Sequence, residues 1–212
     1  MLHSHTGLSV NPCPDTNTFV PGFDIPSHVL KRQPRTSTMD ISRLSSELSS
    51  TATRFPDCCL SISTTLLTAL TTLLPKRPAF ILSIGSGSGL LEGLISHTNA
   101  SVSVEGVEVS SAVNRYIAEE DMHVATGAWG LYPRAQLAAA WMFVYPRDPK
   151  LVSRYIDTYG GRNLEIIVWL GPKVDWVDYE NCLKKSAFDE LEILEEVGLA
   201  PYEIAVVARR SV

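Results

Sequence analysis

The sequence has few cysteines, and none of them is placed as a metal ligand or a redox pair. The four are Cys13, Cys58, Cys59 and Cys182, and no two stand in a C-x-x-C arrangement. This spacing excludes a zinc ribbon or a thioredoxin-like motif, and no other metal-ligand spacing is present, so we predict no metal site. Because no signal peptide is recognisable either, we expect a reduced, cytoplasmic protein.

Positive charge is also scarce. The 212 residues include 18 Lys and Arg against 23 Asp and Glu, a net charge of −5, and no basic run exceeds two residues. A nucleic-acid-binding face needs clustered cations to neutralise phosphates, so we expect no nucleic-acid partner. Long apolar runs are absent too. The Leu-rich segment 57–74 carries seven Ser or Thr residues, which indicates a buried helix and predicts no contact with a membrane.

Three parts of the chain differ in pattern. Residues 1–36 contain five prolines and no sustained period, which predicts an extended N-terminal arm. Residues 37–75 show helical spacing of apolar residues, which predicts a helical cap of two helices, one starting at Asp40 and the other at Asp57. The apolar faces of these helices suggest a possible homodimer. Residues 76–212 form the third part, the core.

The core alternates between short apolar strands and helices. Strands are expected at 79–84, 102–109, 123–125, 137–145, 164–170, 190–195 and 203–208, and helices at 90–97, 112–119 and 148–158. Such alternation predicts an α/β fold with a doubly wound, mostly parallel, seven-stranded sheet. Only a short connection separates the last two strands, so they are expected to pair as an antiparallel hairpin at the C-terminal end.

Three glycines, Gly85, Gly87 and Gly89, interrupt the chain where the first strand should turn into a helix. A triphosphate-binding loop is excluded because Leu90 stands where that motif needs its second glycine, and no lysine lies in the turn. A dinucleotide site is disfavoured, since the third glycine of G-x-G-x-x-G is missing and Glu92 places a negative charge where a pyrophosphate would bind.

The spacing G-x-G-x-G instead resembles the first-strand turn of class I S-adenosylmethionine-dependent methyltransferases. The resemblance covers the Rossmann-like core and is strengthened by the closing hairpin. It implies S-adenosylmethionine as cofactor, with Gly85, Ser86, Gly87 and Gly89 near its ribose and methionine portion.

The segment VEGVEVSSAVNRYI resembles the second strand of this family, which ends in a ribose-binding carboxylate. Glu108 fits that place best, because Ser110 or Ser111 could cap the element that follows, while Glu105 remains the alternative.

The sequence departs from the family after the third strand, where HVATGAWG offers no acidic residue for the adenine amino group. Thr126, Gly127 and Trp129 occupy that place. The indole of Trp129 is expected to form a wall of the adenine site or to stack on the base. All three are therefore candidate cofactor-binding residues.

The reaction zone is expected beyond the fourth strand, because ligands of open parallel sheets lie at the carboxyl ends of the strands. The chain reads FVYPRDP here, which lacks the Asn-Pro-Pro-Tyr type of turn found in the methyltransferases that modify bases or glutamine. Tyr145, for acceptor orientation or proton handling, and Arg147, for an anionic acceptor, are the candidate catalytic residues.

We therefore expect methyl transfer to a small-molecule acceptor. Two alternatives stay open at this point. One is a catalytically inactive or repurposed member of the same fold that acts as a binding or scaffold partner. The other is a nicotinamide-dependent oxidoreductase.

Overall fold

The computed structural model describes residues 38–211, so the predicted arm 1–36 lies outside the described residues. Its helices are α1 (Thr38–Glu47), α2 (Thr64–Leu73), α3 (Leu90–Thr98), α4 (Pro149–Tyr159) and α5 (Trp176–Lys184). Its strands are β1 (Ile81–Ile84), β2 (Val104–Glu108), β3 (Met122–Val124), β4 (Ala140–Val144), β5 (Ile166–Pro172), β6 (Glu190–Leu194) and β7 (Glu203–Arg209). Three short 3-10 turns are η1 (Ser111–Val113), η2 (Glu119–Asp121) and η3 (Pro133–Leu137).

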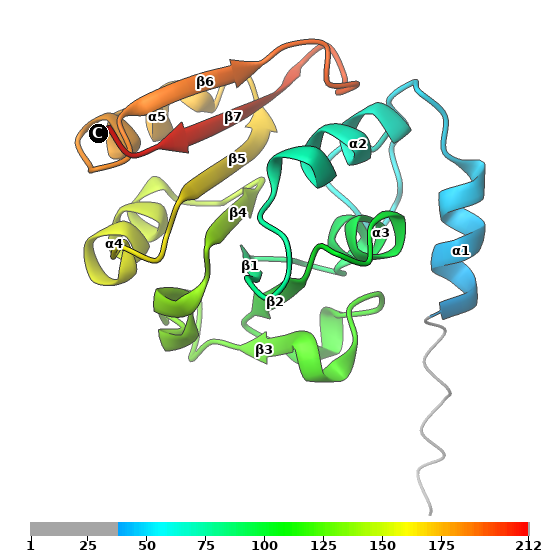
Figure 1. Ribbon diagram of the computed structural model, residues 1–212, viewed down its shortest axis with the longest axis horizontal. Coiled ribbons are helices and arrows are strands. Elements are labelled where there is room, and N and C mark those ends of the chain that lie inside the picture. Colours follow the sequence, from blue (N-terminus) through cyan, green and yellow to red (C-terminus); the bar gives the residue numbers. More distant parts are fainter. Residues whose placement is uncertain (1–37, 212) are drawn as a thin grey trace, which may run out of the picture. The chain divides into compact units, whose positions relative to one another are not determined.

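The seven strands form one sheet in the order β3-β2-β1-β4-β5-β7-β6 (Figure 1). Strands β1 to β5 run parallel, whereas β7 is antiparallel to both of its neighbours. The predicted α/β class, the mostly parallel seven-stranded sheet and the reversed C-terminal strand are therefore confirmed. The chain leaves β1 toward β2 on one side and reaches β4 on the other, so the switch point of the sheet lies at the carboxyl end of β1.

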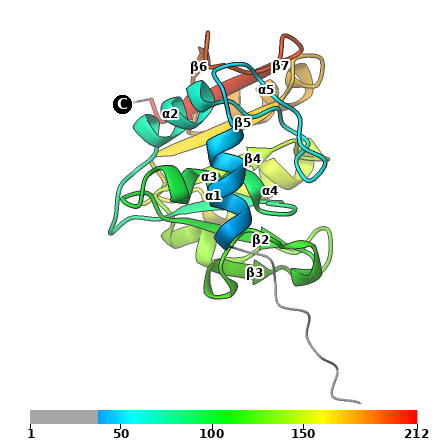
Figure 2. The ribbon, with the colours of Figure 1, turned by 90° about the vertical axis from the view of Figure 1, so that its right-hand side faces the viewer.

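Two hydrophobic cores cover the two faces of the sheet. Along β4, Ala140 and Met142 belong to the core beneath α2 and α3, whereas Trp141 and Phe143 belong to the core beneath α4 and α5. This alternation follows from the two-residue period of a strand that is buried on both faces. Helix α1 packs on α3 at the outside of the first core (Figure 2). No helix within residues 38–211 is both long and apolar enough to span a bilayer.

The caps of the first two helices differ from the prediction. Asp40 lies inside α1 and does not cap it. The N-cap of α2 is Ser63, whose hydroxyl accepts a hydrogen bond from the backbone N–H of Leu66 at 3.0 Å. Asp57 is not a cap, because its carboxylate is bound by side chains from another part of the fold, described below.

One predicted helix of the core is absent, and one helix that is present was not predicted. The helix expected at 112–119 is replaced by the single turn η1 and irregular chain, because Asn114 donates from its side-chain amide to the carbonyl of Ile117 and accepts from the N–H of Ile117. These bonds close a loop that competes with helical hydrogen bonds. Helix α5 was not predicted. It buries only Tyr179 and Leu183, which is too few apolar positions to give a clear helical period.

Candidate functional site

The turn between β1 and α3 gathers three glycines with left-handed backbone. The φ angles of Gly85, Gly87 and Gly89 are +79°, +57° and +77°. Side chains rarely tolerate such angles, which explains why glycine stands at each position. The turn is held against β2, because the N–H groups of Gly85 and Ser86 both donate to the carbonyl of Val107.

The glycines of this turn serve two different purposes. A Cβ atom at Gly89 would lie 2.4 Å from the side chain of Ile117, so this glycine permits close internal packing. At Gly85 and Gly87 a Cβ atom would meet no atom within 4 Å. These two positions therefore leave bare backbone facing open space, which is the arrangement that a closely approaching ligand needs.

Glu108 lies at the carboxyl end of β2, beside this open backbone. One of its carboxylate oxygens accepts a hydrogen bond from the N–H of Gly87 at 3.0 Å, and the other accepts from the N–H of Val109 at 2.9 Å. An ionised carboxylate has about four acceptor sites, so two remain for other donors. The site thus has a fixed, partly unsatisfied anion next to an exposed turn.

Glu105, the alternative to Glu108, occupies a different environment in the middle of β2. Its carboxylate accepts two hydrogen bonds from Arg134, each at 2.7 Å, and pairs with Nε2 of His123 at 2.8 Å. Burial alone would raise the pKa of Glu105, but the hydrogen bonds from Arg134 and His123 outweigh it and lower the pKa. Its acceptor sites are already engaged within the protein.

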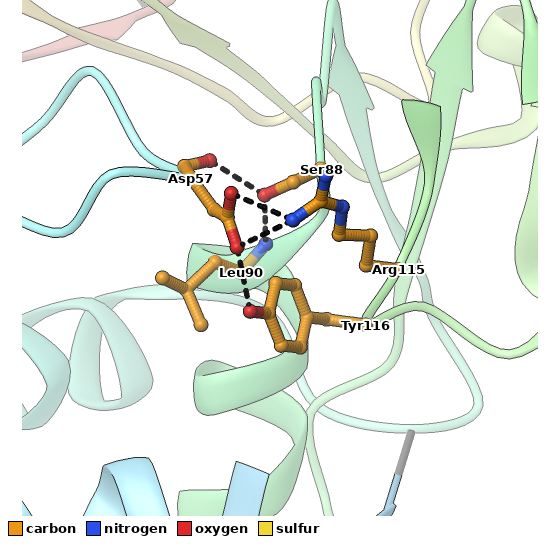
Figure 3. Close-up of polar contacts among 5 residues, drawn as sticks. All are labelled: Asp57, Ser88, Leu90, Arg115 and Tyr116. Atoms are coloured by element: carbon orange, nitrogen blue, oxygen red, sulfur yellow. Dashed lines mark hydrogen bonds and ion pairs between the residues drawn. The ribbon is translucent and has the colours of Figure 1, made fainter. Parts of the chain in front are cut away.

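A network around Asp57 ties the segment before α2 to the glycine turn (Figure 3). The Asp57 carboxylate accepts hydrogen bonds from Arg115 at 2.9 and 3.0 Å and from the hydroxyl of Tyr116 at 2.9 Å. The Asp57 carbonyl accepts from the hydroxyl of Ser88, and that hydroxyl oxygen accepts from the N–H of Leu90, the first residue of α3. The network fixes Ser88, between Gly87 and Gly89, from outside the sheet.

A second carboxylate lies behind the turn and is almost completely buried. Glu92, in the first turn of α3, is 2% exposed, and its Oε1 accepts a hydrogen bond of 2.5 Å from the hydroxyl of Ser83 in β1. Burial is the main cause that raises the pKa of Glu92 to about 7. From the sequence, Glu92 was expected only to disfavour a pyrophosphate. One signal was available, namely a single acidic residue within the apolar helix LLEGLI.

The candidate adenine-binding loop follows β3 and lies beside Glu108. Ala125, directly before Thr126, donates from its N–H to the carbonyl of Glu108 at 2.8 Å. The side chain of Trp129 is 49% exposed, while its carbonyl accepts a hydrogen bond from Arg154. About half of the surface of Trp129 is therefore open to solvent in the loop after β3.

Tyr145 directly follows β4 and has an unusual backbone. Its φ of +49° is in the left-handed region, and its N–H donates to the carbonyl of Leu170 at 2.7 Å. Its hydroxyl donates to Oε1 of Glu203 at 2.7 Å. Burial and this hydrogen bond raise the pKa of Tyr145 well above its usual value, so the phenol keeps its proton at neutral pH. Glu203 is a partner that sequence reasoning missed, since nothing in its neighbourhood marks it.

Arg147 lies at the same edge of the sheet and is exposed. Within residues 38–211 it forms no ion pair, and the neighbouring Asp148 caps α4 by accepting from the N–H of Lys150. The sequence-predicted residues thus fall into two groups. The glycine turn, Glu108 and the loop 126–129 follow the first three strands, and Tyr145 and Arg147 follow the fourth.

Strand order, the reversed β7 and the position of the glycine turn together define a Rossmann-like fold, which this chain shares with solved structures of methyltransferases. At the level of sequence, no family model and no curated protein matches the chain.

Among the solved structures, the methyltransferase domain of bacterial CtHen1-CN is 12% identical with a TM-score of 0.52, over 68% of this chain and 95% of that one. Precorrin-6y C5,15-methyltransferase from Geobacter metallireducens GS-15 is 12% identical with a TM-score of 0.51, over 76% of this chain and 94% of that one. Human N-acetylserotonin methyltransferase, solved in complex with S-adenosylmethionine, is 13% identical with a TM-score of 0.49. That alignment covers 70% of this chain but 51% of the human protein.

Proposed function

We propose that this protein is an S-adenosylmethionine-dependent methyltransferase that acts on a small-molecule acceptor. One observation carries the proposal. Glu108, with acceptor sites to spare, lies beside the open backbone of Gly85 and Gly87 at the carboxyl ends of β1 and β2. Ligands of doubly wound sheets bind at this edge, near the switch point.

The residues at this edge fit the cofactor. Two vicinal ribose hydroxyls match the free acceptor sites of Glu108, and the bare turn at Gly85, Ser86 and Gly87 admits the adjoining part of the molecule without a steric clash. The exposed indole of Trp129 offers a flat apolar surface to the adenine, with Thr126 and Gly127 in the same loop. The cofactor would supply a methyl group that is already activated by the positive charge on its sulfur.

The protein would then contribute mainly by positioning the acceptor for an in-line displacement. Tyr145 keeps its proton and is bound to Glu203, so we assign it to acceptor orientation through its ring and fixed backbone rather than to proton removal. Arg147 supplies an exposed cation at the same edge, with no ion pair among residues 38–211, and is suited to an acceptor that carries a negative charge.

A small-molecule acceptor is favoured over nucleic acid by charge. The chain carries a net charge of −5, and binding along a polyphosphate backbone would require a concentration of cations that the sequence does not have.

A second candidate function is a repurposed, non-catalytic binding protein of the same fold. The loop 125–130 has no carboxylate for the adenine amino group, and the Tyr145 hydroxyl is engaged within the protein. Both observations count against catalysis by this protein, although neither affects the proposed ribose site.

Calorimetric titration with S-adenosylmethionine, S-adenosylhomocysteine and NAD separates these functions. We expect micromolar binding of the first two and none of NAD. Glu108→Gln should weaken both by about tenfold to hundredfold, because a carboxylate that accepts two hydroxyls contributes about 1–3 kcal/mol. Glu190→Gln, at an exposed position of β6, is the matched control and should bind as the wild type does.

The outcomes of this titration are distinct. Binding of NAD alone would replace the proposal by the oxidoreductase, and absence of all binding would favour the repurposed protein. Unchanged affinity in a folded Glu108→Gln variant would show that the ribose assignment is wrong.

A further inference from the structure

Glu92 is a buried carboxylate with no cationic partner among residues 38–211. None of the ion pairs formed among residues 38–211 includes it, and its one side-chain partner is the neutral hydroxyl of Ser83. A buried charge is costly unless a charge of opposite sign accompanies it, so buried carboxylates are normally paired. At 2% exposure, Glu92 is almost entirely removed from bulk solvent, which would otherwise stabilise its charge.

The position of Glu92 is as unusual as its burial. Ser83 lies in β1 two residues before Gly85, and Glu92 lies in α3 three residues after Gly89. The hydrogen bond between them therefore places the carboxylate directly behind the glycine turn, inside the core that α3 forms with the sheet. The positive end of the α3 dipole offsets part of the cost, but it is not a counter-ion.

The titratable groups that act on Glu92 from the surrounding elements are also acidic. Glu108, at the end of β2, repels its negative form, and the Cys58 thiol, in the segment before α2, lies close enough for the charge of Glu92 to raise the pKa of that thiol. Ser83 from β1 is the only side chain among the described residues that donates to the Glu92 carboxylate. The part of the chain that the structure describes therefore provides the anion of a pair without the matching cation.

We propose that Glu92 is the counter-ion for the positively charged methionine end of the cofactor, so that the cation missing from this buried pair arrives with the ligand. The inference rests on the proposed function, because it takes the glycine turn as the place where the cofactor binds. The methionine end carries two cations, the sulfonium and the α-amino group, and either one supplies the positive charge that the Glu92 carboxylate needs.

A thermodynamic consequence follows from this pairing. Without ligand, Glu92 is largely protonated below about pH 7 because burial raises its pKa to about 7. A cation nearby favours the ionised form and lowers the pKa, so binding must release a proton when the pH lies below the value of the free protein. Affinity for a cationic ligand must therefore rise with pH through this range.

The test is calorimetry at pH 6.5 in two buffers that differ in ionisation enthalpy, which measures the protons released on binding. Wild-type protein should release about half a proton or more per S-adenosylmethionine bound, and Glu92→Gln should release none. Gln keeps the size of the side chain and an oxygen that accepts from Ser83. At pH 8 the variant should bind S-adenosylmethionine about tenfold more weakly than wild type, and at pH 6 the difference should shrink toward none.

Two further ligands identify the cation. S-adenosylhomocysteine lacks the sulfonium charge but keeps the amino group, and methylthioadenosine lacks both. Proton release on binding S-adenosylmethionine alone would show that Glu92 pairs with the sulfonium. Proton release on binding S-adenosylhomocysteine as well would show that Glu92 pairs with the amino group. Proton release with methylthioadenosine would overturn the inference, because it would come from the nucleoside end of the site.

Ser83→Ala keeps the test decisive if Glu92→Gln folds poorly. Loss of the hydroxyl removes a hydrogen bond that lowers the pKa of Glu92, so the pH midpoint of the affinity curve should move upward. Equal affinity and equal proton release in wild type and Glu92→Gln would overturn the inference while leaving the cofactor assignment intact. Failure of the wild type to bind any of these ligands would overturn both.

Discussion

Two glutamates are buried at the carboxyl edge of the sheet, and they differ in the number of hydrogen bonds that their carboxylates accept. Glu203, 3% exposed at the start of β7, receives hydrogen bonds from the N–H groups of Ser61 and Ala200 and from the hydroxyl of Tyr145. Glu92, equally buried behind the glycine turn, receives hydrogen bonds only from the hydroxyl of Ser83 and from its own backbone N–H among the described residues.

The two carboxylates differ in how far the protein satisfies their oxygens. The donors around Glu203 come from three separate segments, so its carboxylate oxygens are satisfied by hydrogen bonds within the protein and hold these segments together. Among the described residues, no comparable set of hydrogen-bond donors surrounds the carboxylate of Glu92. A full set of donors gives Glu203 a structural role, whereas the smaller set around Glu92 is the basis of the proposal that a ligand completes it.

The largest expected effect is on the stability of Glu92→Gln. The pKa of Glu92 is raised from 4.5 to about 7, so the folded state holds a proton that the unfolded chain has lost between these values. Wild-type stability must fall as the pH rises through this window. At about 1.4 kcal/mol per pH unit, the variant should be about 3 kcal/mol more stable than wild type at pH 8, and about equally stable at pH 4.5.

Urea denaturation of ligand-free protein at both pH values measures this difference. Glu190→Gln, which changes an exposed glutamate, should show no such gain. If Glu92→Gln were no more stable than wild type at pH 8, Glu92 would already have a stabilising partner, and its contrast with Glu203 would disappear.

The opposite sign is expected for Glu203→Gln. Gln has one acceptor oxygen in place of two and adds an N–H group that faces other donors, so buried N–H groups of the backbone are left unpaired. We expect a loss of about 2 kcal/mol in the free energy of unfolding at pH 8, measured by the same urea denaturation. A gain in stability would mean that Glu203, like Glu92, lacks compensation.

Tyr145→Phe should have the smallest effect of the three. It removes one donor from Glu203 and leaves the two backbone donors in place, so the expected loss is about 1 kcal/mol. Because we assign acceptor orientation to the ring, this variant should retain methyl transfer, whereas Tyr145→Ala should lose most of it. Loss of turnover in a stable Tyr145→Phe protein would instead assign proton handling to the hydroxyl.

The sheet could be predicted because its strands carry their own signal. Strand β5 is apolar throughout and buried on both faces, and the short connection between β6 and β7 permits only antiparallel pairing. Segment 112–119 could not be predicted, because its N–H groups at Arg115 and Tyr116 donate to the carbonyl of Ser88 in a different part of the chain. Such tertiary bonds override local helical spacing.

The candidate site also contains one part that the local sequence predicts and another that only the structure reveals. The glycine spacing is a local pattern, and the structure gives Gly85, Gly87 and Gly89 the positive φ angles that such a turn requires. The ligand-binding roles of this turn and of Glu108 stay predictions. The pairs Ser83–Glu92 and Tyr145–Glu203 join residues from different elements, so they become visible only in three dimensions.

The place of β7 has a consequence for how the protein is made. β7 follows β6 in the chain but lies between β5 and β6 in the sheet. During synthesis, β5 and β6 both leave the ribosome before β7, the strand that lies between them. Until β7 is available, one edge of β5 is unpaired. The sheet therefore cannot be complete until β7 pairs with β5 on one side and with β6 on the other.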